Sequence, residues 1–306
     1  MPEPFRIAVI GQAAFGESVL NALVENGESI AGVFCRPDQS PDTVDPIKTA
    51  AINHGIPTFQ FKRMRSPEAI EAFQNLQVDL GVMAFVTDIV PVEILEAPTR
   101  GTIQYHPSLL PKHRGPSSIN WPIIQGENRT GLSIFWPDHD LDTGPILIQK
   151  EVSIEPDDTL GSVYFNKLFP LGVDAMVEAV RLVREGKAPR IEQDHSQATY
   201  EGWCKTKDTV IDWSMSLSTV YNLIRGADPS PGAHSTFSGK PVFLYAASRS
   251  EGAGEPGTVL SIGEDGVEIA VSDGAVVVGR VRADGKKVAA HDWAEAVSLQ
   301  LGDRLG

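Results

Sequence analysis

Cysteine is almost absent from this chain, since Cys35 and Cys204 are the only two in 306 residues. Two cysteines are too few for a disulfide framework, and these two lack the C-x-x-C spacing of metal and redox sites. Apolar runs near the roughly 18 residues that span a bilayer are also missing, and the first residues lack the basic segment of a signal peptide. These absences predict a cytoplasmic protein with no membrane partner.

Lys and Arg are also scarce relative to Asp and Glu. The chain carries 26 Lys and Arg against 40 Asp and Glu, which gives a net charge of −14 at pH 7. A protein that binds nucleic acid needs cations to replace the counterions condensed on the phosphates. The acidic balance therefore argues against an RNA or DNA substrate.

Short apolar runs alternate with amphipathic segments through the first half of the chain. Residues 6–11 and 80–85 are apolar on both faces, as buried parallel strands are, whereas residues 17–26 and 66–76 have helical spacing. Strands that alternate with helices predict an α/β fold with a right-handed, doubly wound parallel sheet. Ligands of such sheets bind outside the carboxyl ends of the strands.

The composition changes near residue 190. Residues 191–205 are largely polar, and from residue 240 onward short β-rich runs alternate with Gly and Asp turns. The sequence therefore predicts a catalytic domain over residues 1–190, a linker over 191–205 and a smaller, β-barrel-like domain over 206–306.

The turn at residues 11–16, GQAAFG, lies where dinucleotide-binding proteins carry G-x-G-x-x-G. Ala13 replaces the middle glycine, so the backbone cannot approach a pyrophosphate as closely. The sequence predicts a tight strand-to-helix turn here, and no NAD cofactor.

The most specific stretch of the sequence runs from residue 104 to residue 142. His106 follows a strand-like run, and a second run that ends near Asp142 precedes a Thr-Gly turn. A histidine and a carboxylate at neighbouring strand ends can share a proton, which is what chemistry at a carbonyl carbon requires. A lone loop histidine is more often held by a backbone carbonyl, but the shaped loop and the downstream carboxylate favour a catalytic His106.

Other charged residues surround this pair in the sequence. The basic residues 112–114 are expected to be solvated or to face a ligand, and one or two of the three carboxylates in residues 138–142 are expected to form turns. The stretch lacks the glycine and distal glutamate of a calcium loop, and the histidines lack zinc-site spacing, so no metal is predicted. Asp142 is expected to orient His106 and raise its basicity.

The motifs HPSLLPKHRG at 106–115, LDTG at 141–144 and IDW at 211–213 resemble those of the formyltransferases and hydrolases that use 10-formyltetrahydrofolate. The resemblance covers almost the whole length. It is strongest to the hydrolase domain of 10-formyltetrahydrofolate dehydrogenase, and it extends to methionyl-tRNA formyltransferase. It implies a Rossmann-like catalytic domain with the formyltransferase fold and a smaller barrel-like C-terminal domain.

The resemblance also implies a set of site residues. His106 and Asp142 match the catalytic histidine and aspartate of the family, whereas Gln104 stands where the transferases carry asparagine. An amide at this position stabilises the oxyanion of a tetrahedral intermediate, a role that Gln104 is expected to take. The folate-binding residues that the resemblance implies are Phe85, Asp88, Ile89, Val90 and Asp142.

The implied formyl donor is 10-formyltetrahydrofolate, and water is the expected acceptor, which would give tetrahydrofolate and formate. Transfer to an amine stays open, with an amino sugar, a hydroxylated amino acid or methionyl-tRNA as acceptor. Residues 35–48 hold more acid than base where tRNA-dependent transferases carry a basic insertion, which argues against tRNA. A folate carrier is the third alternative, although binding alone would need neither His106 nor Asp142.

Overall fold

The structure, a computed structural model, describes residues 4–38, 40 and 43–306. Gln39, Pro41 and Asp42 of the acidic loop 35–48 therefore lie outside the described residues. The chain divides into two compact units, each assembled from three separate segments. The N-terminal unit comprises Met1–Arg114, Gly131–Glu151 and Leu168–Tyr200, and the C-terminal unit comprises Gly115–Thr130, Val152–Lys167 and Glu201–Gly306.

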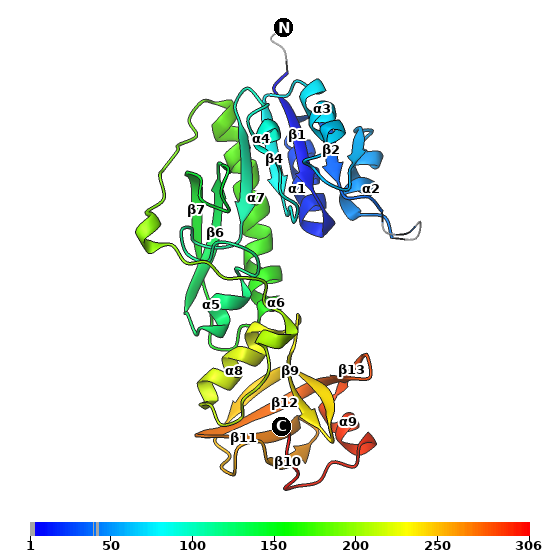
Figure 1. Ribbon diagram of the computed structural model, residues 1–306, viewed down its shortest axis with the longest axis vertical. Helices are drawn as coiled ribbons and strands as arrows, with labels where there is room; N and C mark the ends of the chain where they lie inside the picture. Colours follow the sequence, from blue (N-terminus) through cyan, green and yellow to red (C-terminus); the bar gives the residue numbers. More distant parts are fainter. Residues whose placement is uncertain (1–3, 39, 41–42) are drawn as a thin grey trace. The chain divides into compact units, whose positions relative to one another are not determined.

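A seven-stranded, mostly parallel sheet confirms the predicted doubly wound α/β fold (Figure 1). The strand order is β3-β2-β1-β4-β5-β6-β7, so the winding changes direction between β1 and β4. Open α/β sheets bind ligands beside such a switch point. The strands are β1 (Arg6–Gly11), β2 (Ser29–Cys35), β3 (Thr58–Gln60), β4 (Leu80–Ala84), β5 (Thr102–His106), β6 (Arg129–Phe135) and β7 (Ile146–Ser153).

The sheet departs from the all-parallel expectation at β6, which runs antiparallel to β5 with His106 opposite Ser133. The connection between these strands, residues 107–128, contains the five-residue helix α5 (Asn120–Ile124) rather than a long crossover helix. Parallel neighbours need such a crossover, so β6 returns beside β5 in the opposite direction. Asp142 therefore does not sit at the end of a neighbouring parallel strand, but in the loop that follows β6.

Helices cover the sheet of the N-terminal unit, where α1 packs against α2 and α7, and α3 packs against α4. The first helix begins at Ala13 rather than near residue 17, because the carboxylate of Asp45 accepts the Ala13 N–H at 2.8 Å. Asp45 also caps α2 by accepting from Ile47 N. The helices are α1 (Ala13–Glu25), α2 (Pro46–Asn53), α3 (Pro67–Asn75), α4 (Val92–Leu95), α7 (Phe169–Arg184) and a 3-10 turn at His195–Gln197.

An aromatic contact in this core sets the direction of the side chains on β5. The ring of Tyr105 lies 4.3 Å from that of Phe15 on α1, and Phe169 of α7 packs edge-on against Phe15 at 5.4 Å. Successive side chains of a strand point to opposite faces. Because Tyr105 points into this core, its neighbours Gln104 and His106 both point to the other face.

The C-terminal unit is built around a six-stranded antiparallel sheet, which confirms the predicted β-rich second domain. The pairing follows the path β10-β11-β12-β9-β8, and β13 pairs with β12. The strands are β8 (Ala233–Phe237), β9 (Lys240–Ser250), β10 (Val259–Gly263), β11 (Gly266–Val271), β12 (Gly274–Ala283) and β13 (Lys286–Ala289). The remaining helices are α5, α6 (Leu160–Val163), a π-helix at Tyr164–Leu168, a 3-10 turn at Thr206–Asp208, α8 (Leu217–Gly226) and α9 (Ala290–Ala296).

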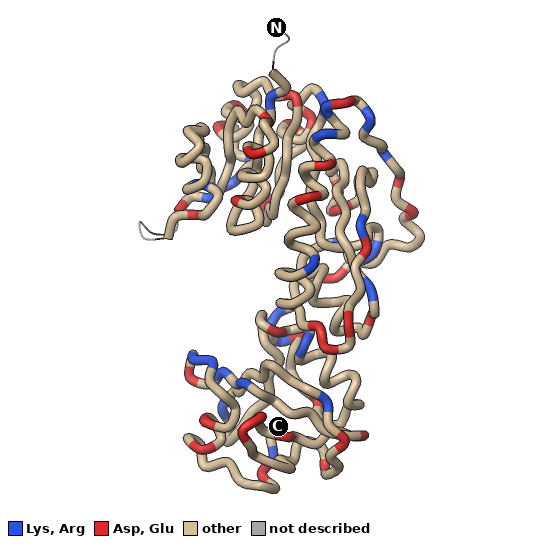
Figure 2. Tube along the Cα trace, turned by 180° about the vertical axis from the view of Figure 1, so that it is seen from behind, with Lys and Arg blue, Asp and Glu red and all other residues tan. Residues whose placement is uncertain are grey.

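The described helices include none with the length and apolar character needed to cross a membrane. Acidic and basic residues are interspersed along the chain, with acidic ones in excess (Figure 2). This distribution is that of an ordinary charged protein surface.

Candidate active site

His106 ends β5 and is 6% exposed. Its Nε2 lies 2.8 Å from the backbone carbonyl oxygen of His113. A carbonyl oxygen can only accept a hydrogen bond, so Nε2 carries the proton and donates it. The hydrogen bond fixes the tautomer and leaves Nδ1 as the ring nitrogen that is available for chemistry.

Asp142 faces that nitrogen from the loop after β6. Its Oδ2 lies 3.5 Å from His106 Nδ1, and the residue is also 6% exposed. In neutral His106 both facing atoms are hydrogen-bond acceptors, so a proton or a proton-donating group shared between them satisfies both. The pair is therefore arranged to accept a proton at Nδ1 and to stabilise the imidazolium that results.

The backbone around Asp142 explains why the LDTG motif has its particular residues. Asp142 has a φ of 57°, in the left-handed region that Asp tolerates better than most side chains. A Cβ on Gly144 would lie 1.8 Å from the carbonyl oxygen of Trp136, so only glycine fits there. These two residues let the loop turn back towards His106.

A network of serine hydroxyls holds the loop after His106. The hydroxyl of Ser108 donates to the carbonyl of Lys112 at 2.7 Å, and that of Ser133 donates to the carbonyl of Ser108 at 2.8 Å. Ser133 Oγ also accepts from Leu110 N at 3.2 Å. Both serines are fully buried, so the loop that carries the His113 carbonyl is fixed to β6.

Gln104 lies two residues before His106 on the same face of β5, opposite Met83 of β4. The residue is partly exposed, and its side-chain amide forms no hydrogen bond with the described part of the chain. An amide placed beside the histidine in this way is available to donate to a ligand. This geometry agrees with the role expected for Gln104 without testing it.

The segment after β4 carries the other expected folate-binding residues. Phe85 is 43% exposed with a φ of 60°, Ile89 is 72% exposed, and Val90 is nearly buried. Asp88 is engaged elsewhere, since its Oδ2 accepts from the backbone N–H of Met64 at 2.8 Å. Phe85 and Ile89 therefore offer apolar surface, whereas the carboxylate of Asp88 holds the neighbouring loop.

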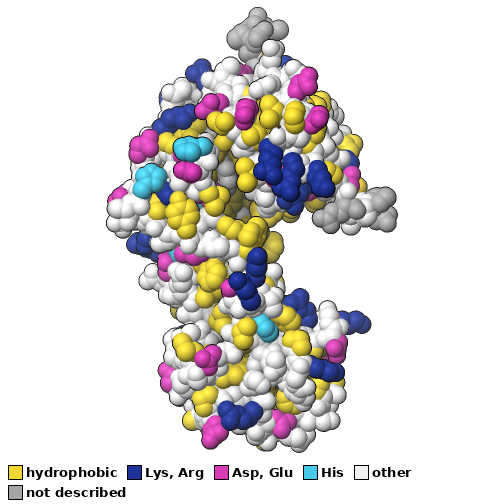
Figure 3. All heavy atoms as spheres, viewed as in Figure 1, with side chains coloured by type: hydrophobic (Ala, Val, Ile, Leu, Met, Phe, Trp, Pro, Cys, Tyr) yellow, Lys and Arg dark blue, Asp and Glu magenta, His cyan; other side chains and the backbone are white. Residues whose placement is uncertain are grey.

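A small pocket lies beside this segment, and a group of Lys and Arg side chains is visible on the same unit (Figure 3). The polar residues that line this pocket are Gln12, Arg36, Lys62, Thr87 and Asp88. The nearby start of α1, where a dinucleotide pyrophosphate would bind, is instead occupied by the carboxylate of Asp45. An anion at that helix end would meet this negative charge.

Residues 112–114 are expected from the sequence to be solvated or to face a ligand, and two of the three are not solvated. His113 is 4% exposed and Arg114 is 2% exposed. The guanidinium of Arg114 is held by the side chains of Gln193 and Tyr200, which lie 79 and 86 residues further along the chain. No local pattern signals such distant partners, so sequence reasoning missed both Gln193 and the structural role of Arg114.

The two thiols are poor candidates for nucleophiles. Burial raises the pKa of Cys35 to about 11 and that of Cys204 to about 11. Both therefore stay protonated at neutral pH. Within the described ranges, His, Cys, Asp and Glu also form no group of three or more that could hold a metal ion.

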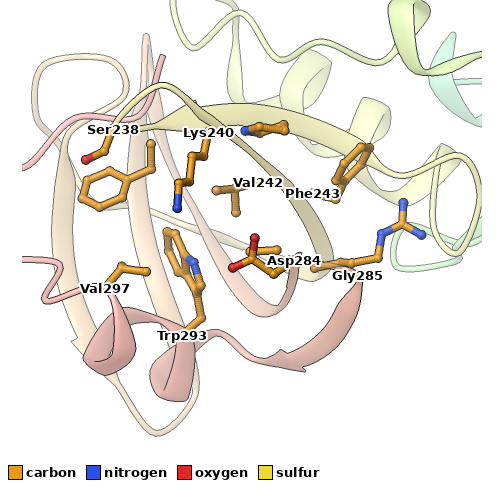
Figure 4. Close-up of a pocket in the computed structure, with 12 residues that line it drawn as sticks. Ser238, Lys240, Val242, Phe243, Asp284, Gly285, Trp293 and Val297 are labelled. Carbon is orange, nitrogen blue, oxygen red and sulfur yellow. The ribbon is translucent and has the colours of Figure 1, made fainter.

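A more voluminous cavity, about 610 Å³, belongs to the C-terminal unit (Figure 4). Lys240 and Asp284 point into it, and Trp293 forms part of its wall. The cavity contains no histidine that could act with the carboxylate of Asp284. Proton transfer at a carbonyl carbon is better served by His106 and Asp142, so chemistry rather than volume identifies the candidate active site.

Comparison with known proteins bears out the resemblance. The Formyl transferase family model matches residues 5–180, and the model of the Formyl transferase C-terminal domain matches residues 204–298. Mitochondrial 10-formyltetrahydrofolate dehydrogenase of Mus musculus is 40% identical over 289 residues, which are 92% of this chain and only 31% of that protein. Methionyl-tRNA formyltransferase of Geotalea daltonii is 36% identical over 307 residues, which are 98% of each chain.

Solved structures confirm the predicted formyltransferase fold. HypX from Aquifex aeolicus in complex with tetrahydrofolic acid has a TM-score of 0.72 at 21% identity, over 98% of this chain and 49% of that chain. An N-formyltransferase from Helicobacter canadensis in complex with folinic acid and dTDP-3-aminofucose has a TM-score of 0.70 at 17% identity, over 92% of this chain and 99% of that chain. At such identities the likeness is one of fold.

Proposed function

The chain belongs to the formyl transferase family, and from this premise we propose that it is an enzyme that hydrolyses 10-formyltetrahydrofolate to tetrahydrofolate and formate. The observation that carries the proposal is the buried pair of His106 Nδ1 and Asp142 Oδ2, 3.5 Å apart. Similarity to a 10-formyltetrahydrofolate dehydrogenase supports the choice of donor.

In the proposed first step, a water oxygen attacks the formyl carbon and His106 Nδ1 takes the proton that the water loses. Nδ1 is the accepting atom because Nε2 donates to the His113 carbonyl. The imidazolium then pairs with Asp142. Negative charge develops on the formyl oxygen, where the amide of Gln104 donates a hydrogen bond that stabilises it by about 3 kcal/mol.

In the second step the tetrahedral intermediate collapses. The bond between the formyl carbon and N10 of the folate breaks, and His106 returns its proton to N10. The oxyanion regains its double bond, which gives formic acid and tetrahydrofolate, and the formic acid loses its proton to solvent as formate. One group thus serves first as base and then as acid, and the scheme uses no metal ion.

The folate would bind against the segment after β4. Phe85 and Ile89 offer exposed apolar surface for the aromatic pterin, and the backbone from Asp88 to Val90 offers polar atoms for its ring edge. Asp142, beside His106, would contact the same ring.

The proposal is tested by incubating the purified protein with 10-formyltetrahydrofolate and no other acceptor, while following formate and tetrahydrofolate. Turnover that is lost in the His106→Ala variant is the expected result. Tight folate binding without formate release would overturn hydrolysis and indicate that an acceptor other than water is required.

Transfer to an amine is the second candidate, since the 36% identity to a methionyl-tRNA formyltransferase extends over 98% of both chains. The acceptor would be an amino sugar, a hydroxylated amino acid or methionyl-tRNA. The net charge of −14 argues against tRNA. Adding each acceptor to the hydrolysis assay separates the two candidates, because a transferase would give formylated product in place of formate.

The remaining expectations belong to the same proposal. We place the enzyme in the cytoplasm, with a small-molecule folate as its partner and neither nucleic acid nor membrane. We also propose a catalytic domain at residues 1–190, a linker at 191–205 and a barrel-like domain at 206–306. Limited proteolysis tests this division, since cleavage is expected first at the exposed linker residues Gly202 and Trp203.

A further inference from the structure

Arg114 is a buried cation that forms no salt bridge with a carboxylate in the described part of the chain. It is 2% exposed, and four of its hydrogen bonds run to neutral acceptors. Nε and Nη2 donate to Gln193 Oε1 at 3.2 and 2.6 Å, Nη1 donates to the Tyr200 hydroxyl at 2.7 Å, and Nη2 donates to His195 Nδ1 at 3.0 Å. Four of its five N–H groups are thus donated to neighbouring side chains of the same unit, so the role of this buried guanidinium lies in what it holds.

Gln193 connects this cation to the loop of Asp142. Its Oε1 receives the two bonds from Arg114, and its Nε2 donates to the carbonyls of Asp142 at 3.0 Å and Gly144 at 2.7 Å. All four hydrogen-bonding positions of the amide are therefore used. The two carbonyls flank the turn in which Asp142 adopts its left-handed φ of 57°.

The same segment also holds the partner of His106. Thr199 accepts the Arg114 N–H on its carbonyl at 3.0 Å and the His113 N–H on its hydroxyl at 2.8 Å. His113 in turn offers its carbonyl to His106 Nε2 at 2.8 Å. The strap formed by residues 193–200 thus contacts the loops on both sides of the catalytic pair.

We propose that Arg114 and Gln193 are positioning residues, which brace the Asp142 turn and set its carboxylate 3.5 Å from His106 Nδ1. Neither would touch the folate. The kinetic part of this inference rests on the proposed hydrolysis. Loss of the brace is expected to lower kcat about tenfold and to leave KM within about twofold, because the proton transfer suffers and binding does not.

The Gln193→Glu variant distinguishes a positioning role of Gln193 from a role in stability alone. The new carboxylate keeps the two bonds from Arg114 and pairs with it, so folding is retained. It cannot donate, so it repels the carbonyls of Asp142 and Gly144. The control is Gln197→Glu, which adds the same charge to an exposed position of the same strap.

Two readouts are needed, kcat and KM for formate release, and the imidazole ¹⁵N signals of His106, assigned by their loss in His106→Ala. A tenfold lower kcat with moved ¹⁵N signals in Gln193→Glu alone supports the brace. Moved signals in a protein that releases no formate also support the brace, while the proposed hydrolysis fails. Wild-type signals and kcat in Gln193→Glu would overturn the brace.

Discussion

Among the described residues, each unit buries an arginine that forms no salt bridge, and the two arginines hold different parts of the chain. Arg114 is fixed by side chains, and its main partner Gln193 is itself bonded to the turn of Asp142. Arg225, on α8 in the C-terminal unit, donates to the carbonyl of Asp158 at 2.9 Å and to Asn222 Oδ1 at 2.8 Å. Burial lowers the pKa of Arg225 below its usual value, yet it stays a cation at neutral pH.

The difference shows how one kind of residue can serve chemistry or folding. A buried guanidinium is costly to desolvate, so each arginine must be offset by the hydrogen bonds it donates. The bonds of Arg225 end on two backbone carbonyls and on the side chain of Asn222, none of which is proposed to react. Those of Arg114 lead, through the amide of Gln193, to the backbone of the turn that carries the Asp142 carboxylate. Loss of the Arg225 bonds should therefore lower the stability of the protein, and loss of the Arg114 bonds should lower its turnover.

The largest effect expected in the N-terminal unit comes from His106→Ala, which sets the kinetic scale for this comparison. Removing the proposed acid and base should lower kcat about a thousandfold, near 4 kcal/mol in activation free energy. Formate release measures it. The matched control is His54→Ala at the end of α2, which should keep wild-type turnover. A His106→Ala variant with more than a tenth of wild-type kcat would move the chemistry to another residue.

Asp142→Asn should have the next largest effect. The amide keeps the size of the side chain and removes the charge that stabilises the imidazolium, so kcat is expected to fall about a hundredfold. Asp140→Asn is the control, because that side chain lies in the same loop and is 69% exposed. Equal losses in both variants would mean that the negative charge of the loop matters rather than the contact with His106.

Local pattern was sufficient to predict β1 and β4 and to single out His106 and Asp142 as the proposed catalytic pair. The buried strands β1 and β4 have continuous apolar runs, and the motifs around His106 and Asp142 marked both residues. The expectation that they lie at neighbouring strand ends is wrong, however. They meet because β6 is antiparallel and its following loop turns back, which depends on the left-handed Asp142 and the crowded Gly144.

Long-range partners could not be predicted from the sequence. Helix α1 starts early because of Asp45, which is 32 residues away, and Arg114 is buried because of Gln193, which is 79 residues away. In the sequence alone, a Lys-His-Arg run and a polar segment near residue 193 look equally solvated. The tertiary fold determines which of these charged side chains are buried.

Arg225→Met is the direct counterpart in the C-terminal unit. The carbonyl of Asp158 would lose the donor Arg225, and that of Glu155 would keep only the Asp158 N–H, so the free energy of unfolding should fall by about 2–3 kcal/mol. Turnover at a temperature where the protein stays folded should remain within about twofold of wild type. Denaturant unfolding and formate release measure the two quantities. A tenfold loss of kcat would break the comparison, since both arginines would then serve the chemistry.

The smallest expected effect concerns the carboxylate side chain of Asp158, whose backbone carbonyl accepts a hydrogen bond from Arg225. Burial alone would raise the pKa of the Asp158 carboxyl, but hydrogen bonds from Lys167 and Ser162 outweigh it and hold the pKa below its usual value. Such a carboxylate stabilises the fold above its unfolded pKa of about 4, and this contribution is lost as the pH falls through the lower folded pKa.

Asp158→Asn should therefore lower the free energy of unfolding by about 1 kcal/mol or less at pH 7, and the difference should shrink on acidification below about pH 4. Asp284→Asn, at an exposed position of the same unit, is the control for the loss of one carboxylate. Because Arg225 bonds to the backbone of Asp158 and not to its carboxylate, the Asn substitution should cost the same with or without Arg225→Met. A coupling energy above about 0.5 kcal/mol between the two substitutions would show that Arg225 interacts strongly with the Asp158 carboxylate as well as with its carbonyl. The role of Arg225 would then resemble the one proposed for Arg114.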